Sequence, residues 1–352
     1  MPDPLHVWYL ASGRRTPSSR YRVYAFAKRL RDRGIRCTVS PSLPEKYDYY
    51  RALGWSNSRR LKRLVRHWHL WQIRRSRPDV VVLERELFDE PTWDFEEQLR
   101  RSVRCLVLDV DDAVFLRYPE KFDRLARMSD GMIVGNDRLQ DHFAPLNPRV
   151  TVIPTCVDLD NYPARPPDVS ARSRLTLGWI GTAGNLNELR LLAPALRVLS
   201  STSAIELCLI TSRPAAAEDV DLTGIDVRFV AWSEQRAVPS LLQCDIGLMP
   251  LHADRPWNHF KCGLKLIEYM AVGLPAVASP VGVNSQIVTD GTNGLLAAGP
   301  DEWLAQLSRL VADAALRSAL GAAARQTVRE RYSVQSQLPL YERTLRDLVA
   351  MA

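Results

Sequence analysis

Short apolar runs alternate with amphipathic segments along the whole chain. The runs are rich in Val, Ile and Leu and are bounded by Gly, Pro, Ser or Asp, which is typical of buried β-strands. Because continuous apolar strands separated by helical segments need cover on both faces, they predict parallel sheets with helices on each side. In the first half of the chain the runs lie at 5–11, 35–40, 79–84, 103–110, 131–135 and 150–154.

The alternation pauses once and then starts again. Residues 160–174 (DNYPARPPDVSARSR) are rich in Pro and Ser and poor in apolar residues, so they are the best candidate for a linker. We therefore expect two doubly wound α/β domains, at 1–165 and 172–332, and a C-terminal helix at 333–352 that packs back toward the first domain. The strands expected in the second domain lie at 175–180, 205–211, 227–230, 246–249 and 275–278.

Composition narrows the class of protein. Hydrophobic residues make up 46% of the 352 residues and charged residues 25%, which excludes disordered, collagen-like and disulfide-scaffold proteins. No stretch approaches the roughly 18 apolar residues of a membrane span. The six cysteines are far apart and form no Cys-x-x-Cys pair, so we expect reduced, mostly buried thiols, no zinc site and a cytoplasmic protein.

The charge is divided unevenly along the chain. The net charge is +7, but residues 1–78 hold 19 Lys and Arg against four Asp and Glu, whereas residues 79–352 hold 28 against 36. A basic front on an otherwise acidic protein indicates an anionic partner for that end.

The basic charge is densest in residues 51–77, which contain nine Lys and Arg, no acid, and Trp55, Trp68 and Trp71. A packed helix with a solvated basic side is one interpretation. Contact with anionic lipid is a second, because basic residues and interfacial tryptophans both favour such a surface. Nucleic acid is a third, but no nucleic-acid-binding motif is present. We expect a peripheral site at the inner face of the cell membrane and no binding of nucleic acid.

The most informative segment is 260–299 (FKCGLKLIEYMAVGLPAVASPVGVNSQIVTDGTNGLLAAG). Leu264 to Met270 has helical spacing, and the turn formed by Gly273 and Pro275 leads into a strand. Lys265 and Glu268 are three residues apart and so share one helix face. The start of this helix is expected at the carboxyl edge of the sheet, where open α/β sheets bind ligands.

From Glu268 onward, EYMAVGLPAVAS resembles the signature of the family 4 (group 1) retaining glycosyltransferases. The resemblance implies the GT-B fold, in which two Rossmann-like domains face each other across a cleft. It implies that a nucleotide-sugar donor binds in that cleft and that neither a metal nor another cofactor is required. It covers the C-terminal half best and the N-terminal half more weakly.

The resemblance assigns donor contacts to the same segment. Glu268 matches the second Glu of the signature, which holds the ribose hydroxyls. The first Glu of the signature falls on Phe260, so a different recognition of the donor sugar is expected. Backbone groups at Lys261, Gly263 and Leu264 are the candidates to replace it.

The family commonly carries an Arg and a Lys after the first strand of the second domain, where they grip the diphosphate. This chain has GWIGTAGNLNELR there, without either residue close to the strand. Gly181, Thr182 and Gly184 can offer backbone N–H groups at a helix N-terminus. Lys265 is the candidate for the missing cation and Lys261 is second, because the leaving diphosphate needs a fixed positive partner. The alternative for Lys265 is a solvated helix residue.

Three further residues are candidates for the nucleobase site. Trp232 and Ser233 follow the strand VRFVA, where the family meets the base, and Arg213 follows LITS nearby. Core packing is the alternative for Trp232. No role is assigned to His252 or His259.

The run LVLDVDDAVFL ends an apolar strand with three aspartates. Asp111 aligns with the His of a His-Asp pair in the family, so we expect Asp111 to orient the donor sugar or the acceptor hydroxyl and Asp112 to support it. Strand-end capping is one alternative, and a metal site is possible by composition alone. A negative group beside the sugar would favour oxocarbenium-like charge.

The loop SGRRTPSSRYR resembles the first strand–helix loop of the family. Ser19, Arg20 and Arg22 are candidates to meet phosphate, from the donor or from a lipid diphosphate. Arg20 and Arg22 cannot share a helix face, so we expect only one of them to do so. Asn136 either faces the cleft or caps a helix.

These features predict a glycosyltransferase that moves a sugar from a nucleotide-sugar to a hydroxyl on a glycan or lipid-linked acceptor with retention of configuration. We expect a role in cell-surface polysaccharide or glycolipid biosynthesis. A catalytically inactive glycosyltransferase-like binding protein is the alternative, because the first Glu and the diphosphate cations are missing. An NAD-dependent enzyme is a weaker one, because Gly178–Gly184 has Gly-x-x-Gly-x-x-Gly spacing and the next strand does not end in an acid.

Overall fold

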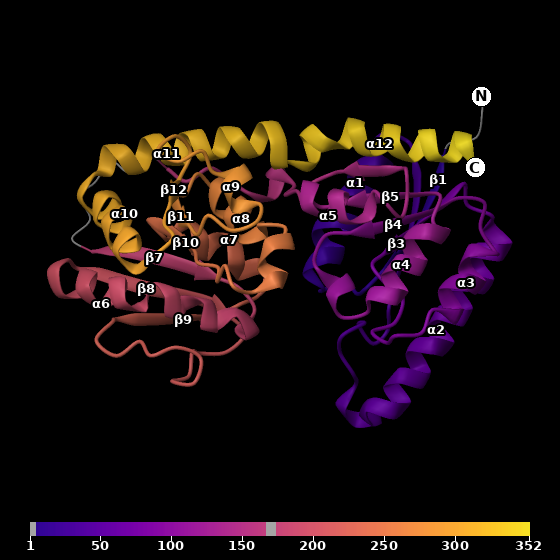
Figure 1. Cartoon of the computed structure of the whole chain (residues 1–352), viewed down its shortest axis with the longest axis horizontal. Coiled ribbons are helices and arrows are strands. Elements are labelled where there is room, and N and C mark those ends of the chain that lie inside the picture. Colours follow the sequence, from indigo (N-terminus) through magenta and orange to yellow (C-terminus); the bar gives the residue numbers. More distant parts are fainter. Residues whose placement is uncertain (1–4, 167–173) are drawn as a thin grey trace. The chain divides into compact units, whose positions relative to one another are not determined.

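The computed structural model describes residues 5–166 and 174–352, so part of the expected linker, at 167–173, lies outside the described residues. The chain forms two compact units (Figure 1). The first unit contains the chain through Cys156 together with Phe260–Cys262 and Val334–Ala352. The second contains Val157–His259 and Gly263–Ser333.

The first unit is built on a six-stranded sheet in which every pairing is parallel. The strand order is β2-β1-β3-β4-β5-β6, and residues of β1, β3 and β4 are almost all fully buried. The register places Glu84 of β3 opposite Asp109 of β4. The strands are β1 (His6–Ala11), β2 (Arg36–Pro41), β3 (Val80–Glu84), β4 (Leu106–Val110), β5 (Gly131–Val134) and β6 (Val150–Val152).

Helices cover both faces of this sheet, as its apolar strands require. The last helix, α12, packs on α1, where the ring of Tyr341 stacks on Phe26 at 4.4 Å between centroids. The helices are η1 (Ser19–Tyr24), α1 (Ala25–Asp32), η2 (Arg51–Leu53), α2 (Gly54–Ser76), α3 (Asp94–Arg100), η3 (Val114–Leu116), α4 (Pro119–Met128), α5 (Asp137–Phe143) and α12 (Val334–Met351).

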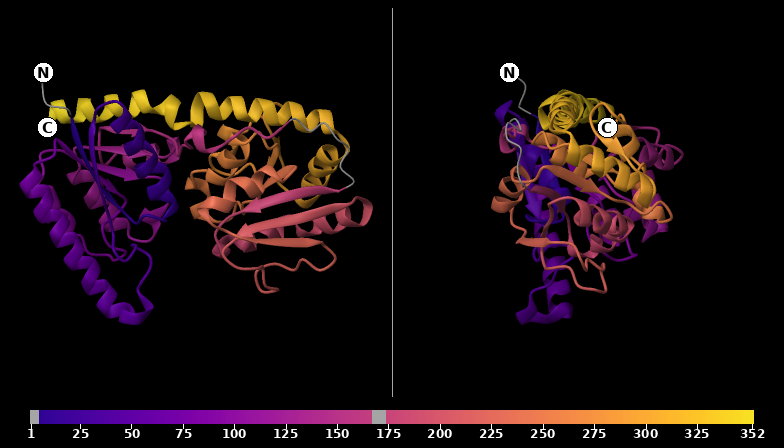
Figure 2. Two further views of the ribbon diagram at one scale, coloured as in Figure 1. Left: turned by 180° about the vertical axis from the view of Figure 1, so that it is seen from behind. Right: turned by 90° about the vertical axis from the view of Figure 1, so that its left-hand side faces the viewer.

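The longest of these is α2, the long purple helix of Figure 2. It has 23 residues and carries most of the basic charge of segment 51–77. Only a few of its residues are buried. Among residues 5–166 and 174–352, no helix is both long enough and apolar enough to cross a membrane.

The second unit repeats the architecture with a second six-stranded parallel sheet, ordered β12-β11-β10-β7-β8-β9. Its strands are β7 (Leu175–Ile180), β8 (Ile205–Thr211), β9 (Val227–Ala231), β10 (Ile246–Met249), β11 (Ala276–Ala278) and β12 (Leu295–Leu296). Its helices are η4 (Leu159–Asn161), η5 (Ala183–Leu191), α6 (Ala193–Thr202), α7 (Glu234–Leu242), η6 (Pro256–Phe260), α8 (Leu264–Ala271), α9 (Asn284–Ile287), α10 (Pro300–Ala312), α11 (Ala314–Thr327) and η7 (Val328–Tyr332).

The structure confirms the expected α/β class with two doubly wound sheets. It places the boundary earlier than the expected 1–165, because residues after Cys156 contact the second unit. Val157 forms a β-bridge with Ser333, and the N–H of Arg165 donates to the carbonyl of Val272 at 2.8 Å. The two-residue strand β12 is missed by the sequence pattern because it is too short to show a period.

One backbone approach fixes how α11 lies on the turn that follows α8. Gly273 ends α8 with a φ of 77°, in the left-handed region that favours glycine. The carbonyl oxygen of Gly273 faces Gly321 of α11, where a Cβ would lie only 2.2 Å from it. Glycine at 321 therefore permits a contact between helix and turn that any side chain would prevent.

We expect Gly321→Ala to lower the free energy of unfolding by about 1–3 kcal/mol, because the helix must move away from Gly273. Glycine to alanine inside a helix normally stabilises by about 1 kcal/mol, so the sign is reversed here. Urea unfolding measures the change. Ser318→Ala, at an exposed position of the same helix, is the control and should be neutral or slightly stabilising. Stabilisation by Gly321→Ala would contradict the close approach.

Candidate functional site

The predicted donor-binding residues of the second unit lie at one edge of its sheet. Because the strands are parallel, the loops after β7, β8, β9 and β10 all leave from the carboxyl edge. These loops and the start of α8 carry Gly181, Thr182, Gly184, Arg213, Trp232, Ser233, Gly263, Leu264, Lys265 and Glu268. Lys261 belongs to the first unit.

Glu268 is held firmly within α8. Its side chain is buried, and the Tyr162 hydroxyl donates to Oε1 at 2.9 Å. The next residue, Tyr269, donates its hydroxyl to the Leu248 carbonyl and accepts the N–H of Ile180, both at 3.1 Å. These bonds tie α8 to β10 and β7, so the position of Glu268 relative to the strand ends is fixed.

Lys265 lies beside the turn that follows β7. Its ammonium Nζ is 4.4 Å from the centre of the buried Trp179 ring, a cation–π contact. A Cβ at Gly181 would lie 3.0 Å from Cε of Lys265 and 2.8 Å from the Trp179 ring, so this close packing depends on glycine. Lys265, the predicted cation for the diphosphate, therefore lies next to the Gly181–Gly184 turn.

One expected role in this turn is wrong. The N–H of Gly181 already donates to the carbonyl of Ile210 on β8 at 3.1 Å, so it cannot serve a diphosphate. The following helix η5 is a 3-10 helix with Thr182 at its N-cap, and the Thr182 hydroxyl accepts the side chain of Asn185 at 2.8 Å. Gly184 sits in the first turn of η5 with open space at its Cβ position.

The nucleobase candidates make local contacts. Arg213 forms a two-pronged ion pair with Asp219, at 2.5 and 2.9 Å, which closes its own loop. Ser233 caps α7 by accepting the N–H of Arg236 at 3.2 Å. The N–H of Trp232 continues the β8–β9 pairing by donating to Thr211. Contact of these residues with a base stays a prediction.

Glu188 is a further site residue that the sequence pattern did not single out. This buried carboxylate accepts the N–H of His252 at 2.8 Å, the Asn258 amide at 3.2 Å and the Arg255 guanidinium at 3.3 Å. It therefore holds the loop after β10 against η5. The available signal was an acid flanked by Leu186 and Leu189 in an apolar helical stretch.

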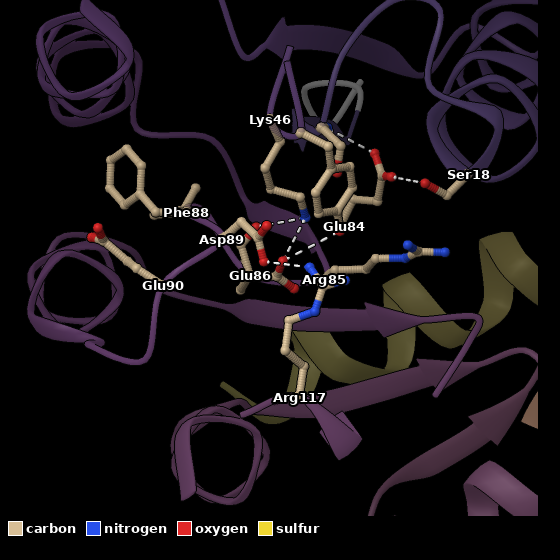
Figure 3. Close-up of polar contacts among 12 residues, drawn as sticks. Ser18, Lys46, Glu84, Arg85, Glu86, Phe88, Asp89, Glu90 and Arg117 are labelled. Carbon is tan, nitrogen blue, oxygen red and sulfur yellow. Dashed lines mark hydrogen bonds and ion pairs between the residues drawn. The ribbon is translucent and has the colours of Figure 1, made fainter. Parts of the chain in front are cut away.

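The carboxyl edge of the first sheet is a network of buried charges (Figure 3). Glu84, at the end of β3, accepts the N–H of Ser12 at 3.0 Å and the hydroxyls of Ser18 and Ser19, each at 2.5 Å. Beside it the Lys46 ammonium pairs with Glu86 at 3.2 Å, and both side chains are enclosed. The segment that follows β3 is thus fixed by the loops on either side of it.

Arg22 and Asp109 form a second buried pair in this edge. Nε and Nη2 of Arg22 donate to the two oxygens of Asp109, and Nη1 donates to the Ile153 carbonyl at 3.0 Å. Burial raises the pKa of Asp109 to about 6, although Arg22 opposes the shift. Ser19 and Arg22 thus hold buried carboxylates, while Arg20 is partly exposed, 5.2 Å from the centre of the Tyr21 ring. Their contact with phosphate stays a prediction.

Asp111 and Asp112 follow β4 in the same edge. Asp111 is buried and accepts Nε of Arg85 at 2.7 Å and Nη2 at 2.6 Å. Arg85 adopts a φ of 57°, unusual for a residue other than glycine, and its N–H donates to the Asp109 carbonyl. The sequence pattern did not single out Arg85, whose only signal is its place directly after the apolar strand VVVLE.

Asp112 is less paired than its neighbour. Its Oδ1 accepts the N–H of Ala113 at 2.9 Å. Burial raises the pKa of Asp112 to about 6, and Asp111 adds to the shift, while Arg85 and Lys261 oppose it. Within residues 5–166 and 174–352, no group of three or more His, Cys, Asp or Glu is placed to hold a metal ion.

Asn136 does more than cap α5. Its Oδ1 accepts the N–H of Leu139 and its Nδ2 donates to the Phe260 carbonyl, both at 3.0 Å. The ring of Phe260 meets Phe115 edge-on at 5.1 Å between centroids. The residue at the position of the first signature Glu is therefore an apolar anchor in the first unit.

Comparison with known proteins decides the family of the second unit. Residues 174–313 match the family described as "Glycosyl transferases group 1". The second unit is a group 1 glycosyltransferase domain. The match confirms that the segment beginning at Glu268 resembles a group 1 glycosyltransferase.

Curated relatives that match this chain are named D-inositol 3-phosphate glycosyltransferases. The one from Nocardiopsis dassonvillei is 26% identical over 233 residues, covering 57% of this chain and 52% of the relative. The one from Xylanimonas cellulosilytica is 30% identical over 199 residues, covering 50% and 46%. The chain thus spans about half the length of the curated relatives it matches.

Solved structures are similar over nearly the whole chain. A glycosyltransferase from Rickettsia africae has a TM-score of 0.73 at 12% identity and covers 99% of this chain and 100% of its own. Sucrose-phosphate synthase from Thermosynechococcus elongatus has 0.72 at 15%, with the same coverage. Anabaena Alr3699/HepE in complex with UDP has 0.65 at 16% and covers 97% and 100%. These likenesses confirm the two-domain GT-B fold.

We expect Asp112→Asn to stabilise the protein at pH 7.5 by on the order of 2 kcal/mol and to stabilise it clearly less at pH 4.5. A pKa of about 6 in the folded state lies above the ordinary 3.8, so the folded protein binds this proton more tightly than the unfolded chain. Ionised Asp112 therefore costs stability above pH 6, and the cost disappears as the pH falls toward 4. Urea unfolding at both pH values measures it.

Asp111→Asn is the matched control, because it makes the same change one residue earlier. It removes the charge that pairs with Arg85, so it should destabilise the protein at pH 7.5. A stability difference between wild type and Asp112→Asn that does not depend on pH would contradict the environment described for Asp112.

Proposed function

We propose that the protein transfers a sugar from a nucleotide-sugar donor to a hydroxyl of a glycan or lipid-linked acceptor, with retention of configuration, in cell-surface polysaccharide or glycolipid biosynthesis. The observation that carries this is the group 1 match over 174–313, with Glu268 and Lys265 at one sheet edge. Anabaena Alr3699/HepE was solved with UDP, with UDP and glucose, and with UDP-glucose, which supports a nucleotide-sugar donor.

In this proposal the fixed part of α8 holds the donor. The carboxylate of Glu268 accepts the two ribose hydroxyls, a task that suits its two oxygens. Lys265 and the first N–H groups of η5 at Gly184 hold the diphosphate, whose negative charge grows as the sugar leaves. Trp232, with Ser233 and Arg213 beside it, meets the base.

The first unit supplies the acceptor side in the same proposal. Asp111, oriented by Arg85, and Asp112 support positive charge that develops on the sugar. Arg20 and Asn136 meet the acceptor or its phosphate, and Ser19 and Arg22 shape the same edge through the carboxylates they hold. No metal and no further cofactor is part of the proposal.

A catalytically inactive binding protein remains the second candidate. It is favoured by Phe260 in the place of the first Glu, because this side chain packs on Phe115 and cannot bind sugar hydroxyls through a carboxylate. Backbone groups of Lys261, Gly263 and Leu264 take over the sugar contact if the protein is active. The activity measurement below separates the two candidates.

The exposed face of α2 supports a peripheral membrane site in the same proposal. Leu64, Trp68 and Trp71 are 65%, 55% and 57% exposed and lie on one helix face together with the exposed basic residues Arg60 and Arg75. Apolar and basic side chains on one face suit an anionic lipid surface. The acceptor would then be presented to the first unit from that surface.

We expect wild type to turn over at least one of a panel of nucleotide-sugars, and Glu268→Gln to lower kcat/KM for it about 10- to 100-fold. The loss follows from the weaker acceptance of the ribose hydroxyls by a neutral amide. Glu330→Gln, on an exposed surface of the same unit, is the control and should behave as wild type. Equal activity of Glu268→Gln would refute the site, and no turnover by wild type would favour the binding protein.

We expect the protein to sediment with vesicles containing phosphatidylglycerol and not with neutral phosphatidylcholine vesicles, and to be released by salt. The double variant Trp68→Ser with Trp71→Ser should weaken this binding about 10-fold. Trp55→Ser is the matched control, because Trp55 is 63% exposed but lies on another face of α2. An equal effect of both changes, or no preference for anionic lipid, would rule out the membrane site.

A further inference from the structure

A cavity of about 340 Å³ lies in the second unit, on the side away from the candidate donor site. It is lined by the turn between α8 and β11, by residues 164–166, and by α11 with the beginning of η7. Because α8 ends and β11 begins there, the cavity is at the amino edge of the parallel sheet. The start of α8 with Lys265 and the start of η5 with Gly184 are at the opposite, carboxyl edge.

The charge of this cavity is of one sign. Four of its lining residues are arginines, and none of them is Asp or Glu. A volume of this size is ordinary for a small-molecule site. The arginines are Arg165, Arg317, Arg325 and Arg329.

Three of the arginines are anchored by the fold. Arg165 forms an ion pair with the buried Asp245, whose other oxygen accepts the N–H of Thr176. Arg317 is buried and donates Nη1 to the Leu310 carbonyl at 2.6 Å, at the end of α10. Arg325 donates Nη1 to the carbonyls of Tyr162 and Ala271. The positive groups are therefore held in place before any ligand arrives, which lowers the entropy cost of binding.

Two of the guanidinium groups keep donors for another acceptor. Both hydrogen bonds that Arg325 makes within the described part of the chain leave from Nη1, so its Nε and Nη2 are not used by them. Arg329, four residues later and exposed, makes a bond from Nη1 to Gln326 at 3.2 Å. Burial and the nearby Arg329 both lower the pKa of Arg325, so the two guanidinium groups repel each other.

We propose that this cavity binds a small phosphate-bearing anion, at a site separate from that of the donor. Planar guanidinium forks match the oxygens of phosphate and give short, charge-assisted hydrogen bonds. The hydroxyl of Ser318, an exposed lining residue one turn before Ala322, adds a neutral donor. Binding at this site does not depend on the proposed function, because none of its residues belongs to the donor machinery.

The test uses the full chain and two probes, inorganic phosphate and glycerol phosphate, titrated calorimetrically at constant ionic strength. We expect saturable binding by wild type and at least a tenfold loss of affinity in Arg329→Glu. Arg309→Glu is the matched control, because Arg309 is also exposed and also bonds to a glutamine three residues before it, at 2.7 Å. It lies outside the cavity and should bind as wild type does. The tighter of the two probes identifies free phosphate or an ester as the ligand.

Two further variants separate this site from others. Ser318→Glu places a carboxylate in the cavity at an exposed helix position, and it should abolish binding without unfolding the protein. Lys265→Met changes the candidate donor site and should leave phosphate binding intact. Absence of saturable binding in wild type would overturn the proposal. Equal loss in Arg329→Glu and Arg309→Glu would do the same, as would loss in Lys265→Met with none in Arg329→Glu.

Discussion

Two carboxylates lie opposite each other on adjacent parallel strands, and the first unit is organised around this constraint. The register of β3 and β4 pairs Glu84 with Asp109, both buried. Ionised groups in such a place must be compensated by hydrogen bonds and opposite charge. The segment after β1 supplies both, because Ser18 and Ser19 donate to Glu84 and Arg22 pairs with Asp109. Residues that the sequence suggested as ligand contacts thus stabilise buried carboxylates of the fold itself.

In the second unit the main constraint is a different one, which is to hold helix α8 in a fixed position against strands β7 and β10. Tyr269 bonds to both β7 and β10, and the Trp179 ring lies against the ammonium of Lys265. Glu268 is held from the other side by Tyr162. The Glu268 carboxylate that matches the signature and the Lys265 ammonium proposed as the missing cation are therefore placed by aromatic residues whose own contacts are structural.

Periodicity was sufficient to predict the two sheets apart from the two-residue strand β12, because buried parallel strands are continuous apolar runs. It could not show that the N–H of Gly181 is used by Ile210, since that depends on the register of β7 and β8. It could not find Arg85 or Glu188 either, because their importance comes from partners 26 to 70 residues away. The domain boundary was misplaced for the same reason, as the bridge between Val157 and Ser333 joins distant parts of the chain.

The first unit is completed by α12, which follows the second unit along the chain, and this order affects how the first unit folds during synthesis. Val334, Leu338, Tyr341, Leu345 and Leu348 of α12 belong to the same apolar core as β1 and α1. The ribosome delivers these residues only after the whole of the second unit has been made. The second sheet can therefore fold on the nascent chain, while the first must wait with an incomplete core. The apolar face of α1 that α12 covers stays exposed through that delay.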